Sequence, residues 1–102
     1  MPYANIAIDQ AGPNTVVAAV AGKAIRVTSL FFLCADAVGV HILSDATELV
    51  GTDAIPMSFA ANGGMALPHG YGWFKTTPGE PLVFDLNAAV AIAGGLTYAL
   101  DG

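Results

Sequence analysis

Charged side chains are scarce in this sequence. Its 102 residues include three Lys or Arg and eight Asp or Glu, so only 11% of the chain is charged and the formal net charge is −5. An ordinary soluble domain carries about 25% charged residues. Nucleic acids and anionic membrane surfaces are held mainly by Lys and Arg, and three dispersed cations cannot form a basic stripe. We therefore expect neither a nucleic acid nor a membrane among the partners of this protein.

Cysteine and long apolar runs are also lacking. The single cysteine, Cys34, rules out an intrachain disulfide, and its place at the end of the apolar run 30–34 favours a buried thiol over a nucleophile. The first residues lack a basic segment, and no stretch reaches 18 consecutive apolar residues. Neither a signal peptide nor a membrane span is therefore expected, and we expect the chain to fold in a cytoplasm.

Hydrophobic residues, by contrast, are abundant and make up 55% of the chain. A small domain has a large surface for its volume and needs polar residues to cover it. This chain has few, so we expect part of its surface to be covered by copies of itself or by a partner. The alternative is a monomer rich in Ala and Gly, whose small side chains raise the hydrophobic fraction without forming an adhesive patch.

Apolar residues recur mainly with a period of two, which is typical of β-strands. Short alternating runs are separated by Gly, Pro and Asn at a spacing near 8–12 residues, which is typical of a sandwich or barrel. We predict a single all-β domain over residues 1–102, an antiparallel, jelly-roll-like β-sandwich with about eight short strands. No significant helix is expected: residues 87–93 are read as a strand or turn. Residues 1–12 are allowed as an extended N-terminal arm.

The strongest predicted strand spans residues 25–34. Regular alternation places Ile25, Val27, Ser29, Phe31 and Leu33 on one face and Leu30 and Phe32 on the other. The strand begins half-polar and ends apolar on both faces, whereas a strand with one wet face should keep alternating. We therefore nominate Leu30 and Phe32 as subunit-interface residues. The alternative is that a loop of the same chain covers this second face.

An aromatic group, formed by Tyr71, Trp73 and Phe74, is the other candidate contact site. Exposed aromatic residues flanked by glycine can stack on sugar rings or form the centre of an interface. The alternative is that Trp73 only packs in the core or at a subunit interface. We nominate all three residues as interface candidates.

No set of residues with the spacing of a catalytic or metal site is present. His41 and His69 have no acidic or cysteine partner at metal-ligand spacing, and His41 is expected to face outward or toward a neighbouring subunit. Three acidic residues share one loop-rich stretch without the pattern of an EF-hand, and are read as solvated turn residues: Asp45, Glu48 and Asp53. No serine lies in a nucleophile elbow, and Lys23 follows no phosphate-binding loop. We predict no catalytic residue, no cofactor and no metal.

Several segments resemble small virion structural proteins of tailed bacteriophages. The first of these segments is the start of a predicted strand, and the last lies close to residue 102. All four are packing or turn motifs: Ala21-Gly22-Lys23-x-Ile25-Arg26-Val27, Gly72-Trp73-Phe74-x-Thr76, Gly79-Glu80-x-Leu82 and Gly94-Gly95-Leu96-Thr97-Tyr98. The resemblance implies a capsid decoration (cement) protein or a fibre-type module, built as a β-sandwich that forms a homotrimer. It transfers no catalytic residue.

The expected function is therefore that of a non-enzymatic decoration protein that stabilises the outer shell of a virion. Its expected partners are its own copies and the major capsid protein or another virion protein, and its expected location is the virion, after folding in the cytoplasm of a bacterial host. The acidic net charge suits a surface away from packaged DNA. The alternatives are a carbohydrate- or receptor-binding module of a tail or fibre, which would use Trp73, and a small hydrolase with His41 or His69 near a carboxylate.

Overall fold

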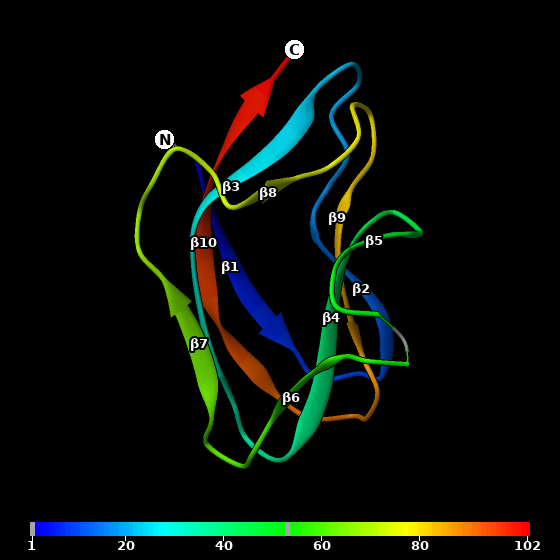
Figure 1. The fold of residues 1–102 in the computed structure, drawn as a ribbon, viewed down its shortest axis with the longest axis vertical. Helices are drawn as coiled ribbons and strands as arrows, with labels where there is room; N and C mark the ends of the chain where they lie inside the picture. Colours follow the sequence, from blue (N-terminus) through cyan, green and yellow to red (C-terminus); the bar gives the residue numbers. More distant parts are fainter. Residues whose placement is uncertain (1, 53) are drawn as a thin grey trace.

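The chain forms two antiparallel sheets packed as a β-sandwich, as seen in a computed structural model that describes residues 2–52 and 54–102 (Figure 1). Sheet A contains five strands: β1 (Tyr3–Ile8), β3 (Ala24–Cys34), β7 (Gly64–Leu67), β8 (Phe74–Lys75) and β10 (Ile92–Asp101). Sheet B contains the other five: β2 (Gly12–Val17), β4 (Val38–Ser44), β5 (Thr47–Val50), β6 (Met57–Phe59) and β9 (Leu82–Leu86).

The strands cross repeatedly from one sheet to the other. Sheet A has the order β1-β10-β3-β7, with β8 also paired to β3, and sheet B has the order β2-β9-β4-β5, with β6 also paired to β4. This nesting of strands in two sheets is that of a jelly roll. The all-β prediction is confirmed, although the structure has ten strands rather than about eight. The extra strands arise because segments as short as β6 and β8, with three and two residues, count as strands.

The beginning of the chain is part of a sheet. Residues 3–8 form β1, which pairs along its whole length with β10. The prediction of a free arm over residues 1–12 is therefore wrong for this segment, because the alternating Ile6 and Ile8 bury their side chains in the core. At residues 87–91 the chain bends and then enters β10, and the described residues contain no helix.

The core lies between the two sheets and consists of branched aliphatic residues around two aromatic rings. Phe32 of sheet A meets Phe84 of sheet B edge to face, with ring centroids 6.0 Å apart, and meets Phe59 in the same way at 5.3 Å. Such edge-to-face pairs are the favoured arrangement of aromatic rings. The core is therefore closed by contacts within a single chain.

A β-bulge in β3 decides which residues of this strand reach the core. Ser29 lies opposite Thr97 and Val27 lies opposite Tyr98, so Thr28 is an extra residue in the register with β10. An extra residue in one strand reverses the side-chain alternation beyond it. Ile25 and Val27 face the core before the bulge, and the even-numbered positions face it afterwards.

Because of the bulge, two sequence-based predictions are wrong. Leu30 and Phe32, nominated as interface residues, are each only 1% exposed and lie in the core of the same chain. Phe31 and Leu33, predicted to share a face with Ile25, instead lie on the outer surface with 51% and 65% of their area exposed. Regular alternation gave the wrong face, because it cannot include the extra residue at Thr28.

Candidate functional site

The outer face of sheet A carries two exposed, large apolar side chains. Phe31 and Leu33 of β3 project from this face at the centre of the sheet. Their cross-strand neighbours are small: Gly95 and Ala66 lie opposite Phe31, and Ala93 and Gly64 lie opposite Leu33. The two large side chains therefore stand above a floor of Gly and Ala.

Hollows lie beside these two projections. One, of about 390 Å³, is lined by Phe31, Leu33 and residues of β7, and a second, of about 240 Å³, lies between Leu33 and Ala93. A Cβ at position 64 would overlap the carbonyl oxygen of Phe32, so close approach of the two backbones requires glycine there. The surface around Phe31 and Leu33 consists of apolar projections and shallow depressions.

The part of this face around Phe31 and Leu33 carries no charge, whereas Arg26, Lys75 and Asp101 lie at the other end of the same face. Alternation along each strand assigns the following residues to the uncharged part, none of them Asp, Glu, Lys or Arg: Tyr3, Asn5, Ala7, Ser29, Phe31, Leu33, Gly64, Ala66, Ala93, Gly95 and Thr97. A second molecule could approach this part of the face without desolvating a charge, although the chain as a whole has a net charge of −5. We call this set of residues the sheet A face.

Sequence reasoning found the right strand but missed Phe31 and Leu33 as its exposed residues. The available signal was the run of apolar residues from Leu30 to Cys34, which showed that both faces of β3 are apolar there. The signal for the bulge was weak, since Thr28 and Ser29 fit a regular strand as well as an irregular one. In the structure, the hydroxyl groups of Thr28 and Ser29 both contact the hydroxyl group of Thr97, at 2.8 Å and 2.6 Å respectively.

The three residues of the predicted aromatic group differ in their exposure. Tyr71 is 85% exposed and Trp73 is 48% exposed, whereas Phe74 packs against the core. The indole N–H of Trp73 donates a hydrogen bond to the carbonyl oxygen of Pro68 at 3.0 Å. Tyr71 and Trp73 therefore remain available to a ligand, and Phe74 mainly anchors the segment to the sandwich.

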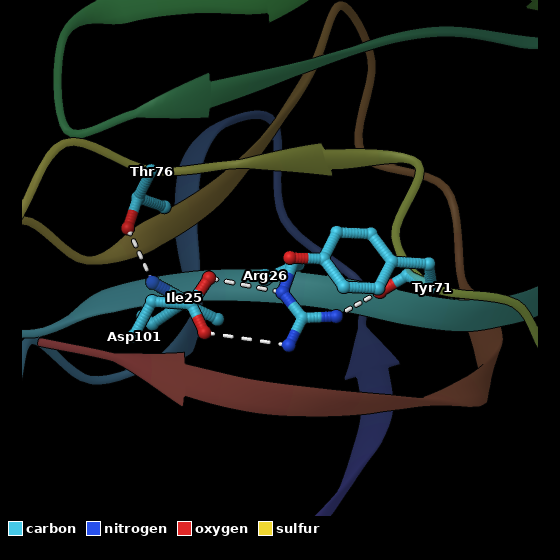
Figure 2. A network of polar contacts seen from close by, with 5 residues as sticks. All are labelled: Ile25, Arg26, Tyr71, Thr76 and Asp101. Atoms are coloured by element: carbon cyan, nitrogen blue, oxygen red, sulfur yellow. Dashed lines mark hydrogen bonds and ion pairs between the residues drawn. The ribbon is translucent and has the colours of Figure 1, made fainter.

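Arg26 of β3 organises the polar contacts beside Tyr71 (Figure 2). Its Nε donates to Asp101 Oδ2 at 2.9 Å and its Nη2 to Asp101 Oδ1 at 3.3 Å, while Nη1 donates to the carbonyl oxygen of Tyr71. The guanidinium carbon also lies 4.2 Å from the centroid of the Tyr71 ring, within the range of a cation–π contact. One side chain thus joins β3, the end of β10 and the loop before β8.

This arrangement favours the ionised forms of both partners. The hydrogen bond from Arg26 lowers the pKa of Asp101 below its ordinary value, and the same bond raises the pKa of Arg26. A shallow pocket of about 180 Å³ lies between this ion pair and the aromatic rings, with Lys75 on its rim. An aromatic platform beside a fixed ion pair can stack on a flat ring and hydrogen-bond to its polar substituents.

The two histidines do not come together in a site. His41 is buried on β4, with Nε2 3.9 Å from Asp85 Oδ2, and the backbone of Gly51 packs against its Cβ. Alternation with the core residues Val40 and Ile42 places His41 on the outer side of sheet B, as predicted, but a loop of the same chain covers it, so its side chain is buried. His69 is exposed in the loop after β7.

No metal cluster appears among the residues that the structure describes. These residues contain no group of three or more His, Cys, Asp or Glu side chains able to hold an ion. Asp45 lies in the turn between β4 and β5 with a φ of 52°, and Glu48 lies in β5, while Asp53 is outside the described residues.

No helix in the described chain is long and apolar enough to cross a membrane. Comparisons of this chain with protein-family models, with curated proteins and with solved structures found no match.

Proposed function

We propose that this protein is a non-enzymatic structural subunit that associates with copies of itself through the sheet A face. The observation that carries the proposal is the exposure of Phe31 and Leu33 within the uncharged sheet A face. Contiguous apolar patches on a soluble protein mark interaction sites, and the centre of an interface is poor in charged residues. The apolar projections and the shallow hollows beside them suit contact with another copy of this chain.

The assembly that we propose is the outer shell of a virion. There the protein would act as a capsid decoration protein, a homotrimer that contacts the major capsid protein or another virion protein and stabilises the shell. The support is the resemblance of segments such as Gly72-Trp73-Phe74 to those of tailed-bacteriophage structural proteins, together with the acidic net charge, which suits a surface away from packaged DNA. Such a protein would fold in the bacterial cytoplasm before it joins the virion.

Native mass spectrometry with a matched pair of variants tests the self-association. Leu33→Glu places a carboxylate in the centre of the sheet A face, and we expect it to lower the number of subunits in the complex. Ile55→Glu is the control, because Ile55 is an equally large exposed side chain located in a loop of the sheet B layer. A wild-type protein that stays monomeric at micromolar concentration, or a Leu33→Glu variant with unchanged mass, would refute the proposal.

A second candidate function is the binding of a carbohydrate or a receptor in a phage tail or fibre. The observation that favours it is the exposure of Tyr71 and Trp73 around the pocket beside Arg26. Because Trp73 is the only tryptophan, its fluorescence reports directly on this site. We expect iodide to quench it, and a bound saccharide to protect it in the wild type and not in Tyr71→Ala. Emission that iodide cannot quench, or a saccharide screen without protection, would remove this candidate.

A further inference from the structure

Among the described edge strands, β1 is the one that is longer than four residues and contains neither a proline nor a charged residue within its bounds. Natural sheets protect their edges with proline, charged residues, bulges or short strands. The other edge strands show such features within their bounds: Pro13 in β2, Glu48 in β5, Lys75 in the two-residue β8, and lengths of only three and four residues in β6 and β7. β1 is six residues long, regular and uncharged, with the sequence Tyr-Ala-Asn-Ile-Ala-Ile.

The free hydrogen-bonding groups of β1 follow from its pairing with β10. The N–H of Tyr98 donates to the carbonyl oxygen of Pro2 at 3.0 Å, so Pro2 faces β10. Backbone groups of an antiparallel strand point alternately to either side. Ala4, Ile6 and Ile8 therefore bond to β10, and the N–H and C=O groups of Tyr3, Asn5 and Ala7 point away from the sheet.

We infer that β1 pairs with β1 of a second copy of this chain, antiparallel and around a two-fold axis at Asn5. In this register Tyr3 lies opposite Ala7 of the second copy, and Asn5 lies opposite Asn5 of the second copy. Each of the three residues with free backbone groups then donates one hydrogen bond and accepts one, so all these groups are satisfied at once. No other register of two antiparallel copies pairs all three.

The side chains of β1 suit this register. The large Tyr3 meets the small Ala7, and the ring of Tyr3 already leans over Gly95, where an added Cβ would overlap its hydroxyl group, so the ring leaves the strand edge clear. The two Asn5 amides meet at the axis and can donate to and accept from each other. On the core side Ala4 lies beside the bulkier Ile6 of the second copy.

Charge also favours a second copy at this edge. Two chains with a net charge of −5 repel each other over most of their surfaces, but Tyr3–Ile8 contains no charged residue. The pairing would join the two A sheets, with both sheet A faces on the same side of the joined sheet. The inference rests on the proposed self-association, which it deepens by naming a second contact, made by the backbone edge of β1 rather than by the side chains of the sheet A face.

Variants at Asn5 test the pairing without disturbing the fold. Asn5→Pro removes an N–H that faces away from β10, so the ladder within the subunit stays intact, which thermal unfolding would verify. Asn5→Lys places two like charges at the axis, and Asn5→Thr restores an uncharged strand former. Thr47→Lys on the edge strand β5 is the matched control for the added charge.

Native mass spectrometry gives the first readout. In the Leu33→Glu background, where the sheet A face is disabled, we expect a dimer that Asn5→Pro and Asn5→Lys convert to monomer and that Asn5→Thr and Thr47→Lys leave intact. A monomeric Leu33→Glu protein, or an Asn5→Pro variant that keeps the dimer mass, overturns the pairing while the sheet A face contact stands. An unchanged mass in Leu33→Glu, together with a mass that Asn5→Pro reduces and Asn5→Thr does not, overturns the face contact and keeps the pairing.

Amide hydrogen exchange gives an independent readout. The amides of Tyr3 and Ala7 lie on the free edge of the monomer, so they should exchange rapidly in Asn5→Lys and become strongly protected in the wild-type complex. The amides of Ala4 and Ile6, which bond to β10, should be protected in both. Rapid exchange of Tyr3 and Ala7 in the wild-type complex would overturn the inference.

Discussion

Thr97 of β10 lies opposite Ser29 of β3 with the two hydroxyl oxygens 2.6 Å apart, while the next residue along β10 already lies opposite Val27. This step makes Thr28 an extra residue in β3 and reverses the alternation of β3 beyond it. A single irregularity therefore turns Leu30 and Phe32 into core residues and Phe31 and Leu33 into surface residues. The face on which the proposed function depends is a consequence of this bulge.

Two adjacent phenylalanines should respond to truncation in opposite ways. We expect Phe32→Ala to lower the free energy of unfolding by about 3–5 kcal/mol, because it leaves a cavity beside Phe59 and Phe84. Phe31→Ala should change it by no more than about 0.5 kcal/mol when subunits in the same oligomeric state are compared. Chemical denaturation of both variants measures the difference, and equal losses would contradict the proposed faces of β3.

The adjacent glycines Gly94 and Gly95 should also differ. A Cβ at position 94 would overlap the carbonyl oxygen of Phe31, which belongs to the backbone of the neighbouring strand, so we expect Gly94→Ala to destabilise by about 1–3 kcal/mol. A Cβ at position 95 meets only the mobile end of Tyr3. Gly95→Ala should therefore be nearly neutral, and thermal unfolding of both variants would check this order.

The Arg26–Asp101 ion pair should make a small, pH-dependent contribution to stability. The hydrogen bond from Arg26 lowers the pKa of Asp101 in the folded state below the ordinary value of 3.8, so the contribution is present above that value. It is lost as the pH falls below the ordinary value and through the lowered pKa, because the proton then binds more tightly to the unfolded chain. Water screens this pair, which keeps the effect small.

Asp101→Asn provides the test of that contribution. As the pH is lowered from about 5 into the strongly acidic range, the free energy of unfolding should fall less steeply for the variant than for the wild type. The difference is expected in this range because the pKa of Asp101 is lowered in the folded protein. Parallel urea titrations over this range compare the two proteins. Identical slopes would show that the carboxylate of Asp101 does not interact with Arg26 in solution.

Cys34 should be unreactive in the folded protein. Its side chain is buried, and burial raises the pKa of the thiol above its ordinary value, so little thiolate forms near neutral pH. We expect an aromatic disulfide reagent to modify Cys34 only after unfolding in guanidinium, and slowly in native buffer at a rate set by opening of the structure. Fast modification of the native protein would contradict the burial of Cys34 beside the start of β10.

Much of the fold follows from local pattern. Alternation of apolar and polar residues predicted the antiparallel sandwich and the long third strand, and residues 87–93 were correctly read as a strand or turn. The extended N-terminal arm over residues 1–12 was not correct for Tyr3–Ile8, which pairs with β10, a strand about 90 residues away in the sequence. Pairing between distant segments leaves no mark in either segment alone.

At the aromatic site, too, local sequence predicted some features, while others depend on contacts between distant segments. The sequence placed Tyr71, Trp73 and Phe74 together because they are neighbours in the chain. It could not show that Phe74 turns inward, or that Arg26 and Asp101, from two distant strands, meet beside Tyr71. These contacts depend on the pairing of β3 with both β8 and β10, which is a property of the folded chain.

The sequence by itself determined the fold class and the shortage of charge, since both follow from composition and from the two-residue period of side chains along a strand. Only the tertiary structure decided which face of each strand is buried. A one-residue bulge at Thr28 exchanges the inner and outer positions of β3, and local sequence carries almost no energetic preference for such a bulge until β10 pairs beside it. The exposure of Phe31 and Leu33 is therefore a result of pairing between strands that are far apart in the chain.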